Sequence, residues 1–459
     1  MSHFSNELRL REKHLIKMSP KTFSNLFPMA MKTHVQKKLR QSLPLVFSAM
    51  LLVFFPSCED QLESSYTYQT QVPVFLQVNA FREADIIIEP PKPLDNPGKI
   101  YIFGDYLFVS EPGKGIHILD NTDPASPRNL NFINIPGTGD LAINDHILYA
   151  DNYVDLLAFD ISDPQDIELV KREEDVFPNL YSNEETGTIV TYKDTLITST
   201  DPNMMWSSWG RPAFRTDFMA FESMAAVSSD ASRGGGQNYG QGGSMARFTL
   251  LSGHLYTVDD YDLRVFNVED PTDPQYLKNI NLGWGIETIF PFKGNLFIGS
   301  MTGMHIYDAS IPSDPKKMAV YEHVTSCDPV VVNDTHAFVT LRSGAMCRMG
   351  VDELHVLDIT DLYKPRLIKS YPMDNPHGLG LLGDYLYLAE GEHGLKSFNV
   401  ADVLEIASNQ LEHLDDFAAI DIIPGPKSLI VIGPDGVCQF DYSDPEKLKK
   451  LSCINVSFR

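Results

Sequence analysis

The chain has 459 residues, of which 43% are hydrophobic and 21% are charged, so it is long and apolar enough to bury a sizeable core. Asp and Glu outnumber Lys and Arg by 61 to 37, which gives a formal net charge of −24. Nucleic acids and anionic membrane surfaces repel such a chain, and we therefore expect no nucleic acid among its partners.

The first 57 residues have the layout of a secretory signal peptide. An apolar run covers Leu43–Phe55, and four Lys and Arg residues between positions 32 and 40 precede it. The run is too short to cross a membrane as a stable helix, which favours a cleaved leader. An uncleaved helix and a released protein are the alternatives. The residues before Met29 or Met31 look like an over-long start of the reading frame.

A lone cysteine, Cys58, follows the leader and a small residue, Ser57. This arrangement resembles the cleavage site of bacterial lipoproteins, at which the cysteine becomes the lipidated first residue of the mature chain. Phe55 departs from the small aliphatic residue that is usual three places before the cysteine. Glu59 and Asp60 resemble the surface-export signal of lipoproteins in one Gram-negative phylum. The sequence thus predicts a lipid anchor in the outer membrane and display on the cell surface, with a periplasm-facing position as the alternative.

Residues 58–96 are polar and contain several prolines, which predicts a tether. Val72–Val78 within this segment could also add an outer strand to the domain that follows, and the residues leave this open. The domain at 97–459 begins with four short apolar runs, separated by pairs such as Gly-Asp and Asp-Pro that are typical of hairpins and loops. These runs are Ile100–Phe103, Tyr106–Val109, Ile116–Leu119 and Leu130–Ile133.

A six-residue pattern that ends in Asp or Asn recurs seven times along this domain. Its copies are Gly115–Asp120, Asp155–Asp160, Asp262–Asn267, Gly303–Asp308, Glu353–Asp358, Gly394–Asn399 and Gly436–Asp441. In four of the six gaps, successive copies end 40 to 42 residues apart, which is the period of a four-stranded propeller blade. The short apolar runs exclude helical repeats of similar length. We therefore predict an all-β fold, a seven-bladed β-propeller of four-stranded blades whose ring can close without a swapped strand.

Two gaps between copies are longer and indicate insertions. The larger one places an insertion at about 176–244, between the second and third blades, and the smaller one carries Ser343–Asp352. Gly187–Thr198 looks like a hairpin inside the larger insertion. Four aromatic residues in its later, polar part could contact sugar rings or a protein partner, or could instead pack against the propeller wall. They are Trp206, Trp209, Phe214 and Phe218.

Four cysteines remain after Cys58, an even number in an oxidising location, and two disulfides are plausible. Cys438 and Cys453 flank a turn symmetrically, so they would face each other across the third and fourth strands of one blade. Cys327 and Cys347 would close a 20-residue loop. Zinc is a poor alternative, because no Cys-x-x-Cys pair or clustered histidine accompanies them.

The repeated strand and several longer stretches resemble one known family. The strand is similar to the core of the LVIVD repeat, and the longer stretches are Gly98–Ile102, Lys114–Asn121, Tyr149–Leu156, Glu287–Pro291 and Cys327–Val332. Over Val72–Val456 the chain resembles the LVIVD-repeat β-propeller lipoproteins of Gram-negative bacteria. The resemblance implies a β-propeller, an outer-membrane lipoprotein and a Cys327–Cys347 pair, and it transfers no catalytic residue.

Ligands of propellers usually meet the loops at the mouth of the central channel, and alignment to the repeat places five residues at or near this rim. They are Asp140, Glu287, Asp328, His377 and Asp416, and Trp284 is a related candidate in a rim turn. The carboxylates and the imidazole could hold Ca²⁺ or a cationic group, although we expect no resident cofactor. The alternative is that each of them caps a turn. Trp284, between two glycines, could instead contact a sugar ring or a protein partner.

No Ser-His-Asp or Cys-His-Asn arrangement stands out in the sequence. We therefore expect a non-enzymatic, surface-anchored binding or scaffold protein that presents its propeller to a protein or glycan partner. The alternative is a hydrolase or lyase acting on an extracellular glycan, which needs two of the rim carboxylates about 5–10 Å apart. A purely structural envelope protein is the third possibility.

Overall fold

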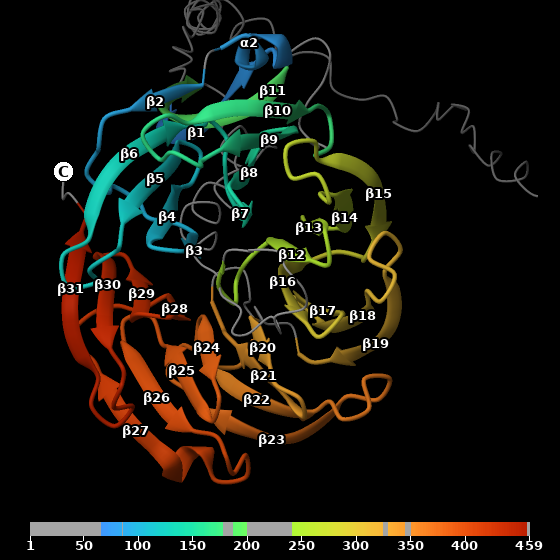
Figure 1. The fold of residues 1–459 in the computed structure, drawn as a ribbon, viewed down its shortest axis with the longest axis vertical. Helices are drawn as coiled ribbons and strands as arrows, with labels where there is room; N and C mark the ends of the chain where they lie inside the picture. Colours follow the sequence, from blue (N-terminus) through green and yellow to red (C-terminus); the bar gives the residue numbers. More distant parts are fainter. Residues whose placement is uncertain are drawn as a thin grey trace, which may run out of the picture. The chain divides into compact units, whose positions relative to one another are not determined.

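The computed structural model describes residues 66–84, 86–177, 187–199, 241–324, 329–344 and 350–456. Seven antiparallel sheets stand around a common centre, six with four strands and one with five (Figure 1). The predicted seven-bladed β-propeller is therefore confirmed, and the long insertion falls between the second and third blades. Among the residues described, no helix is long and apolar enough to span a membrane.

The strands of each blade follow one another from the centre of the ring outward. Blade 1 contains β3 (Ile100–Phe103), β4 (Tyr106–Glu111), β5 (Gly115–Asp120) and β6 (Arg128–Asn134); blade 2 contains β7 (Leu141–Asn144), β8 (Ile147–Asn152), β9 (Asp155–Asp160) and β10 (Glu168–Glu173); blade 3 contains β12 (Phe248–Leu251), β13 (His254–Val258), β14 (Asp262–Asn267) and β15 (Gln275–Asn281). Blade 4 contains β16 (Ile286–Phe292), β17 (Asn295–Ser300), β18 (Gly303–Asp308) and β19 (Lys316–Glu322); blade 5 contains β20 (Val330–Val332), β21 (His336–Leu341), β22 (Glu353–Asp358) and β23 (Arg366–Pro372). Blade 6 contains β24 (Leu379–Leu382), β25 (Tyr385–Ala389), β26 (Leu395–Asn399) and β27 (Gln410–Leu414), with the 3-10 turn η3 (Ile406–Asn409) before β27; blade 7 contains β28 (Asp421–Pro424), β29 (Leu429–Gly433), β30 (Gly436–Asp441) and β31 (Lys449–Asn455).

The six-residue pattern is the third strand of every blade, and its final Asp or Asn ends that strand. In all seven copies the side-chain Oδ1 accepts a hydrogen bond from the backbone N–H two residues later, at 2.8–3.0 Å. This Asx turn begins the loop to the outermost strand. A short side chain with an acceptor oxygen is needed at that position, which explains why the repeat is recognisable in the sequence.

The ring closes between blade 7 and blade 1 without a shared strand, since every strand of blade 7 comes from the C-terminal part of the chain. Apolar side chains of both blades form one buried cluster across this seam. Ile100 and Leu107 contribute from blade 1, and Ile423 and Ile432 contribute from blade 7. Side-chain packing therefore replaces the strand exchange that closes many propellers.

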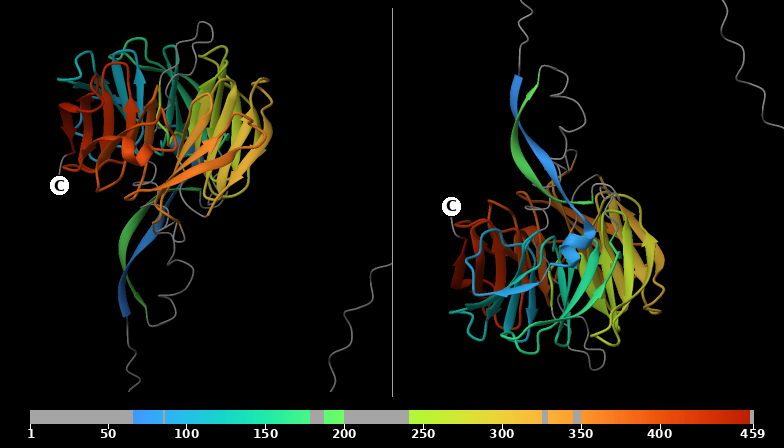
Figure 2. Two further views of the ribbon diagram at one scale, coloured as in Figure 1. Left: turned by 90° about the horizontal axis from the view of Figure 1, so that it is seen from below. Right: turned by 90° about the horizontal axis from the view of Figure 1, so that it is seen from above.

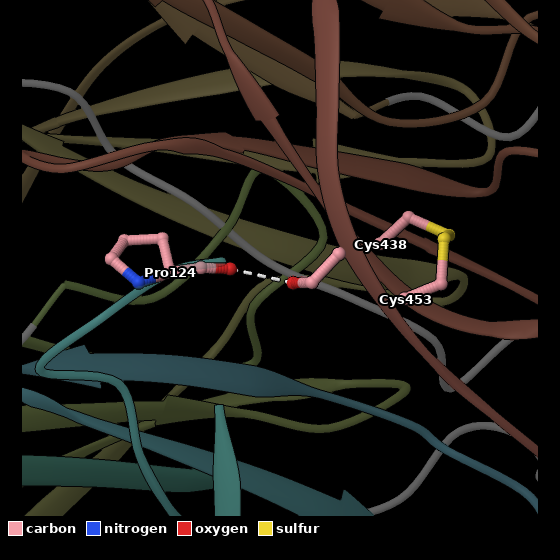
Figure 3. The surroundings of a disulfide bond; sticks show 4 residues. Pro124, Cys438 and Cys453 are labelled. Atoms are coloured by element: carbon pink, nitrogen blue, oxygen red, sulfur yellow. Dashed lines mark hydrogen bonds between the residues drawn. A yellow bond between two sulfur atoms is a disulfide. The ribbon is translucent and has the colours of Figure 1, made fainter. Parts of the chain in front are cut away.

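A polar contact and a disulfide lie together at the outer edge of the same seam (Figure 3). Ser452 Oγ donates a hydrogen bond to the carbonyl oxygen of Pro124 in blade 1, at 2.6 Å. The next residue, Cys453, is joined to Cys438 by a disulfide that links the third and fourth strands of blade 7, as predicted. The cross-link thus fixes the strand that contacts blade 1.

Part of the segment predicted as a tether forms secondary structure. β1 (Tyr66–Leu76) pairs along its length with β11 (Thr188–Ser199) of the insertion. The hairpin predicted at 187–198 is therefore wrong, because β11 contains no Gly or Pro for a tight turn and runs as one strand. Val72–Val78 adds no strand to blade 1; the fifth strand there is β2 (Ile87–Glu89), which pairs with β6.

A short helix, α2 (Val78–Arg82), fixes the base of this β1–β11 ribbon to blade 2. Arg82 Nη2 lies 2.5 Å from Asp155 Oδ1, and two further carboxylates surround the same guanidinium. Phe81 is buried, with its ring 5.1 Å from that of Tyr153. Asp155 begins a third strand, so the helix lies on the face where the first and third strands begin, and Figure 2 shows the ribbon leaving this face. We call it the rim face.

Candidate functional site at the channel mouth

Seven structurally equivalent residues stand at the start of the inner strands, at the channel mouth on the rim face. The strand registers define them. In each blade the third residue of the six-residue copy pairs with a residue of the second strand, which in turn pairs with a residue of the inner strand. The residues that immediately precede these inner-strand residues are, from blade 1 to blade 7, Lys99, Asp140, Arg247, Thr288, Pro329, Gly378 and Asp421. The four charged residues thus come from consecutive blades 7, 1, 2 and 3.

Alignment of the sequence alone came within one residue of these positions in four blades. It named Asp140, Glu287, Asp328 and His377. In blade 7 it named Asp416, which is exposed and lies five residues before Asp421. The run Phe417–Ile423 is apolar apart from Asp421. The sequence pattern therefore places the start of the strand at Phe417, before β28 begins at Asp421. The search for carboxylates also passed over Lys99.

The last residues of the insertion, Gln241–Arg247, occupy the channel mouth before they lead into β12 of blade 3; we call them the channel segment. Its residues 242–246 are buried. Hydrogen bonds join it to the surrounding blades at 2.7–3.2 Å. The bonded pairs are Gln241 with Ile102 of blade 1, Ser244 with Leu379 of blade 6 and Asp421 of blade 7, and Ala246 with Ile289 of blade 4. The chain therefore fills the site where the sequence predicted a ligand.

The side chains of Asp140 and Lys99 bind the backbone of the channel segment through hydrogen bonds. Asp140 Oδ2 accepts the backbone N–H groups of Arg247 and Phe248, at 2.5 and 3.2 Å. Lys99 Nζ donates to Met245 O at 2.5 Å. Burial raises the pKa of Asp140 and lowers the pKa of Lys99 to about 8, and the opposite charge of each residue counteracts the shift of the other. Both charges are thus bound to the protein's own backbone.

Asp151 and His377 complete the mouth, where His377 is buried and Asp151 is partly exposed. Asp151 Oδ1 accepts the backbone N–H groups of Gly139 and Asp140 at 2.7 and 3.0 Å, while burial raises its pKa to about 6. The His377 backbone carbonyl accepts the hydroxyl of Thr340 at 2.6 Å. Burial, followed by the charge of Arg342, lowers the pKa of His377 well below its ordinary value, so this imidazole is neutral at pH 7. These groups position the loops of the mouth.

Exposed aromatic side chains lie beside this buried set, on blades 3 and 4. Trp284 precedes β16 and is 56% exposed, and Tyr261 stands between β13 and β14 and is 38% exposed. Their loops are joined, because Leu282 N–H donates to Tyr261 O at 2.8 Å. Asp260 and Arg247 flank them, with 3.6 Å between Oδ1 and Nη2. We call these four side chains, without Leu282, the aromatic rim.

The structure describes only some of the remaining predicted residues. Glu287 is only partly buried and lies next to Thr288, which holds the channel position in blade 4. Within the ranges described, no three His, Cys, Asp or Glu side chains are placed so that they could hold a metal ion. Several predicted residues lie outside the described residues: Cys58, Trp206, Trp209, Phe214, Phe218, Cys327, Asp328 and Cys347.

Comparison with known families identifies the repeat. Residues 97–132, which contain β3, β4, β5 and most of β6, match the family model of the LVIVD repeat. Blade 1 is thus similar to an LVIVD repeat. The third strand of this matched segment is the one that recurs in the other six blades. No curated protein matches the chain.

Solved structures with a similar arrangement of strands include three from different sources. The computationally designed protein Ika8 has 8% sequence identity and a TM-score of 0.48, and the match covers 82% of this chain and 94% of that one. Sqt1 from Saccharomyces cerevisiae has 11% identity, a TM-score of 0.46 and coverages of 78% and 97%. BamB from Moraxella catarrhalis has 10% identity, a TM-score of 0.42 and coverages of 81% and 96%.

Proposed function

We propose that this protein is a lipid-anchored, non-enzymatic binding protein of the outer membrane, which presents its propeller to a protein or glycan partner at the cell surface. The channel segment is the observation that carries the proposal. It fills the channel mouth, and the carboxylates of Asp140 and Asp151 are used to hold backbone N–H groups. The exposed loops of the rim face then remain as the binding surface.

The alternative function, hydrolysis or elimination on an extracellular glycan, makes a different demand on the same residues. Two carboxylates would have to reach the bond that is broken, one as general acid and one as base or nucleophile. Asp140 and Asp421 are buried beneath the channel segment, so a substrate would reach them only if that segment left the mouth. A binding protein needs no such movement.

The lipid anchor is supported by the leader, Cys58 and the acidic pair behind it. Tyr66, at the end of the ribbon remote from α2, follows Cys58 by only eight residues. A lipid on Cys58 would therefore act through the β1–β11 ribbon and α2, which attach to the rim face. We infer that the ribbon transmits the anchor to the propeller.

Lipid attachment and surface display can be measured on cells that carry the full-length protein or Cys58→Ala. A clickable palmitate analogue should label the first protein and not the second. Protease added to intact cells should digest the labelled protein. A labelled protein that resists protease until the outer membrane is opened would indicate the periplasm-facing position, and an unlabelled wild type would contradict the anchor.

Binding without turnover can be measured with the purified protein and with polysaccharide extracted from the surface of the producing cells. We expect co-sedimentation or, for a protein partner, a specific cross-link on intact cells, with no new reducing or unsaturated ends. New chain ends that disappear in a folded Asp140→Asn protein would support the glycan-active enzyme instead.

A further inference from the structure

We infer that the aromatic rim is a binding site for a neutral carbohydrate, with Trp284 as the platform on which a sugar ring stacks; this inference rests on the proposed binding function. The site lies beside the filled channel mouth and shares Arg247 with it. Its four side chains are Tyr261, Trp284, Asp260 and Arg247, and all of them lie on the rim face.

Trp284 is exposed although its turn is rigid. Gly283 and Gly285 flank it with φ values of 101° and 86°, in the left-handed region that favours glycine. The backbone N–H groups of Gly285 and Ile286 both donate to Asp260 O, at 2.9 and 3.2 Å. An indole on a mobile loop could pack against another part of the protein. The rigid backbone of this turn instead keeps the Trp284 side chain 56% exposed. Exposed aromatic side chains held in this way are typical of binding surfaces.

Tyr261 gives the site a second ring. It is 38% exposed, and its backbone N–H is fixed by Asp259 Oδ1 at 2.9 Å. Its carbonyl oxygen accepts the N–H of Leu282, two residues before Trp284. Two amphipathic rings on hydrogen-bonded neighbouring loops can contact the apolar faces of one or two pyranose units, and the phenol hydroxyl can also bond to a sugar hydroxyl.

The charges beside the rings favour a neutral polyhydroxylated ligand over an ion. Asp260 supplies acceptor oxygens and Arg247 supplies guanidinium donors, 3.6 Å apart, with about a third and a quarter of the side chains exposed. An anion would meet the carboxylate and a cation would meet the guanidinium, so their attractions and repulsions largely cancel. Sugar hydroxyls both donate and accept, and they can use both groups at once.

The geometry is also prepared before binding. The backbone N–H of Arg247 is fixed by the buried Asp140 carboxylate at 2.5 Å, and the backbone of Asp260 is fixed by the Trp284 turn. Little conformational entropy would then be lost when a ligand orders these groups. The buried mouth and the exposed rim are thus connected through Arg247, because the mouth fixes the backbone of this rim residue.

The test uses affinity electrophoresis of the mature protein in gels that contain one neutral polysaccharide each: mannan, dextran, amylose, galactan or xyloglucan. We expect retardation by at least one of them. Trp284→Ala should weaken that retardation at least tenfold, Tyr261→Ala should weaken it less, and Trp284→Phe should retain part of it. Tyr363→Ala is the matched control, because Tyr363 is 65% exposed on a loop of the opposite face.

Each outcome decides the inference. Retardation that depends on Trp284 and not on Tyr363 supports it, provided that circular dichroism and the melting temperature of the variants match the wild type. Absence of retardation by every polysaccharide, or equal retardation of Trp284→Ala and wild type, overturns it. A specific protein cross-link on intact cells in that case would preserve the proposed binding function, while release of sugars from the gel matrix would contradict that function.

Discussion

The channel mouth and the aromatic rim are built by adjacent residues, yet they use polar groups in opposite ways. Arg247 belongs to both, since its backbone N–H is bound by Asp140 in the mouth and its guanidinium lies near Asp260 on the rim. In the mouth, charged groups are buried and bound to the chain itself. On the rim, side chains stay exposed on rigid turns. Removing a side chain should therefore impair folding in the mouth and binding at the rim.

The largest effect is expected from Asp140→Ala. This change leaves the N–H groups of Arg247 and Phe248 without their acceptor and removes the carboxylate that contributes most to stabilising the buried Lys99 ammonium, ahead of Asp421 and Asp151. Uncompensated buried groups of this kind cost about 3–5 kcal/mol of unfolding free energy. Urea denaturation measures the loss. Asp416→Ala, an exposed aspartate predicted for the same site, should change stability by no more than about 0.5 kcal/mol; equal losses in both variants would show that the mouth is not a structural centre.

The seam between blades 7 and 1 provides a second structural region for comparison. Replacement of both Cys438 and Cys453 by serine removes a cross-link that spans 15 residues. A closed loop of that length stabilises a folded protein by about 3 kcal/mol. The serine pair should unfold at lower urea concentration than the oxidised wild type, and reduction should bring the wild type close to the variant. A wild type insensitive to reduction would mean that packing across the seam suffices.

Asp151 links the stability of the mouth to pH. Its pKa is raised by burial to about 6, against an ordinary value of 3.8, so the folded protein binds more protons than the unfolded chain between these two values. This group therefore contributes less stability as pH rises from 4 to 6, and its ionised form is unfavourable at pH 7. Asp151→Asn keeps an oxygen for the N–H groups of Gly139 and Asp140. It should remove this part of the pH dependence and raise stability at pH 7 by up to about 3 kcal/mol. A variant with the wild-type pH profile would assign the dependence to another group.

The fold could be predicted from the sequence because the Asx turns and the alternating strands are local features, repeated in every blade. The pairing of β1 with β11 could not, since it joins segments more than a hundred residues apart. The same limit applies to the mouth. Asp140 was found through its offset from the repeat, but nothing local shows that Met245 and Arg247 return to the channel and use Lys99 and Asp140 as partners. Burial of charges by a distant segment has no signature in the sequence.

The smallest effect on stability is expected from Trp284→Ala, although it should have the largest effect on binding. The indole is more than half exposed, and the turn is held by Asp260 O and by glycines on either side, none of which the substitution removes. The unfolding free energy should change by about 0.5 kcal/mol or less. The exposure itself can be measured with Trp206→Phe and Trp209→Phe, which leave Trp284 as the only indole. Its fluorescence should be quenched readily by acrylamide, and a bound oligosaccharide should protect it. An indole that resists acrylamide without ligand would place Trp284 among the packed residues and remove the contrast between rim and mouth.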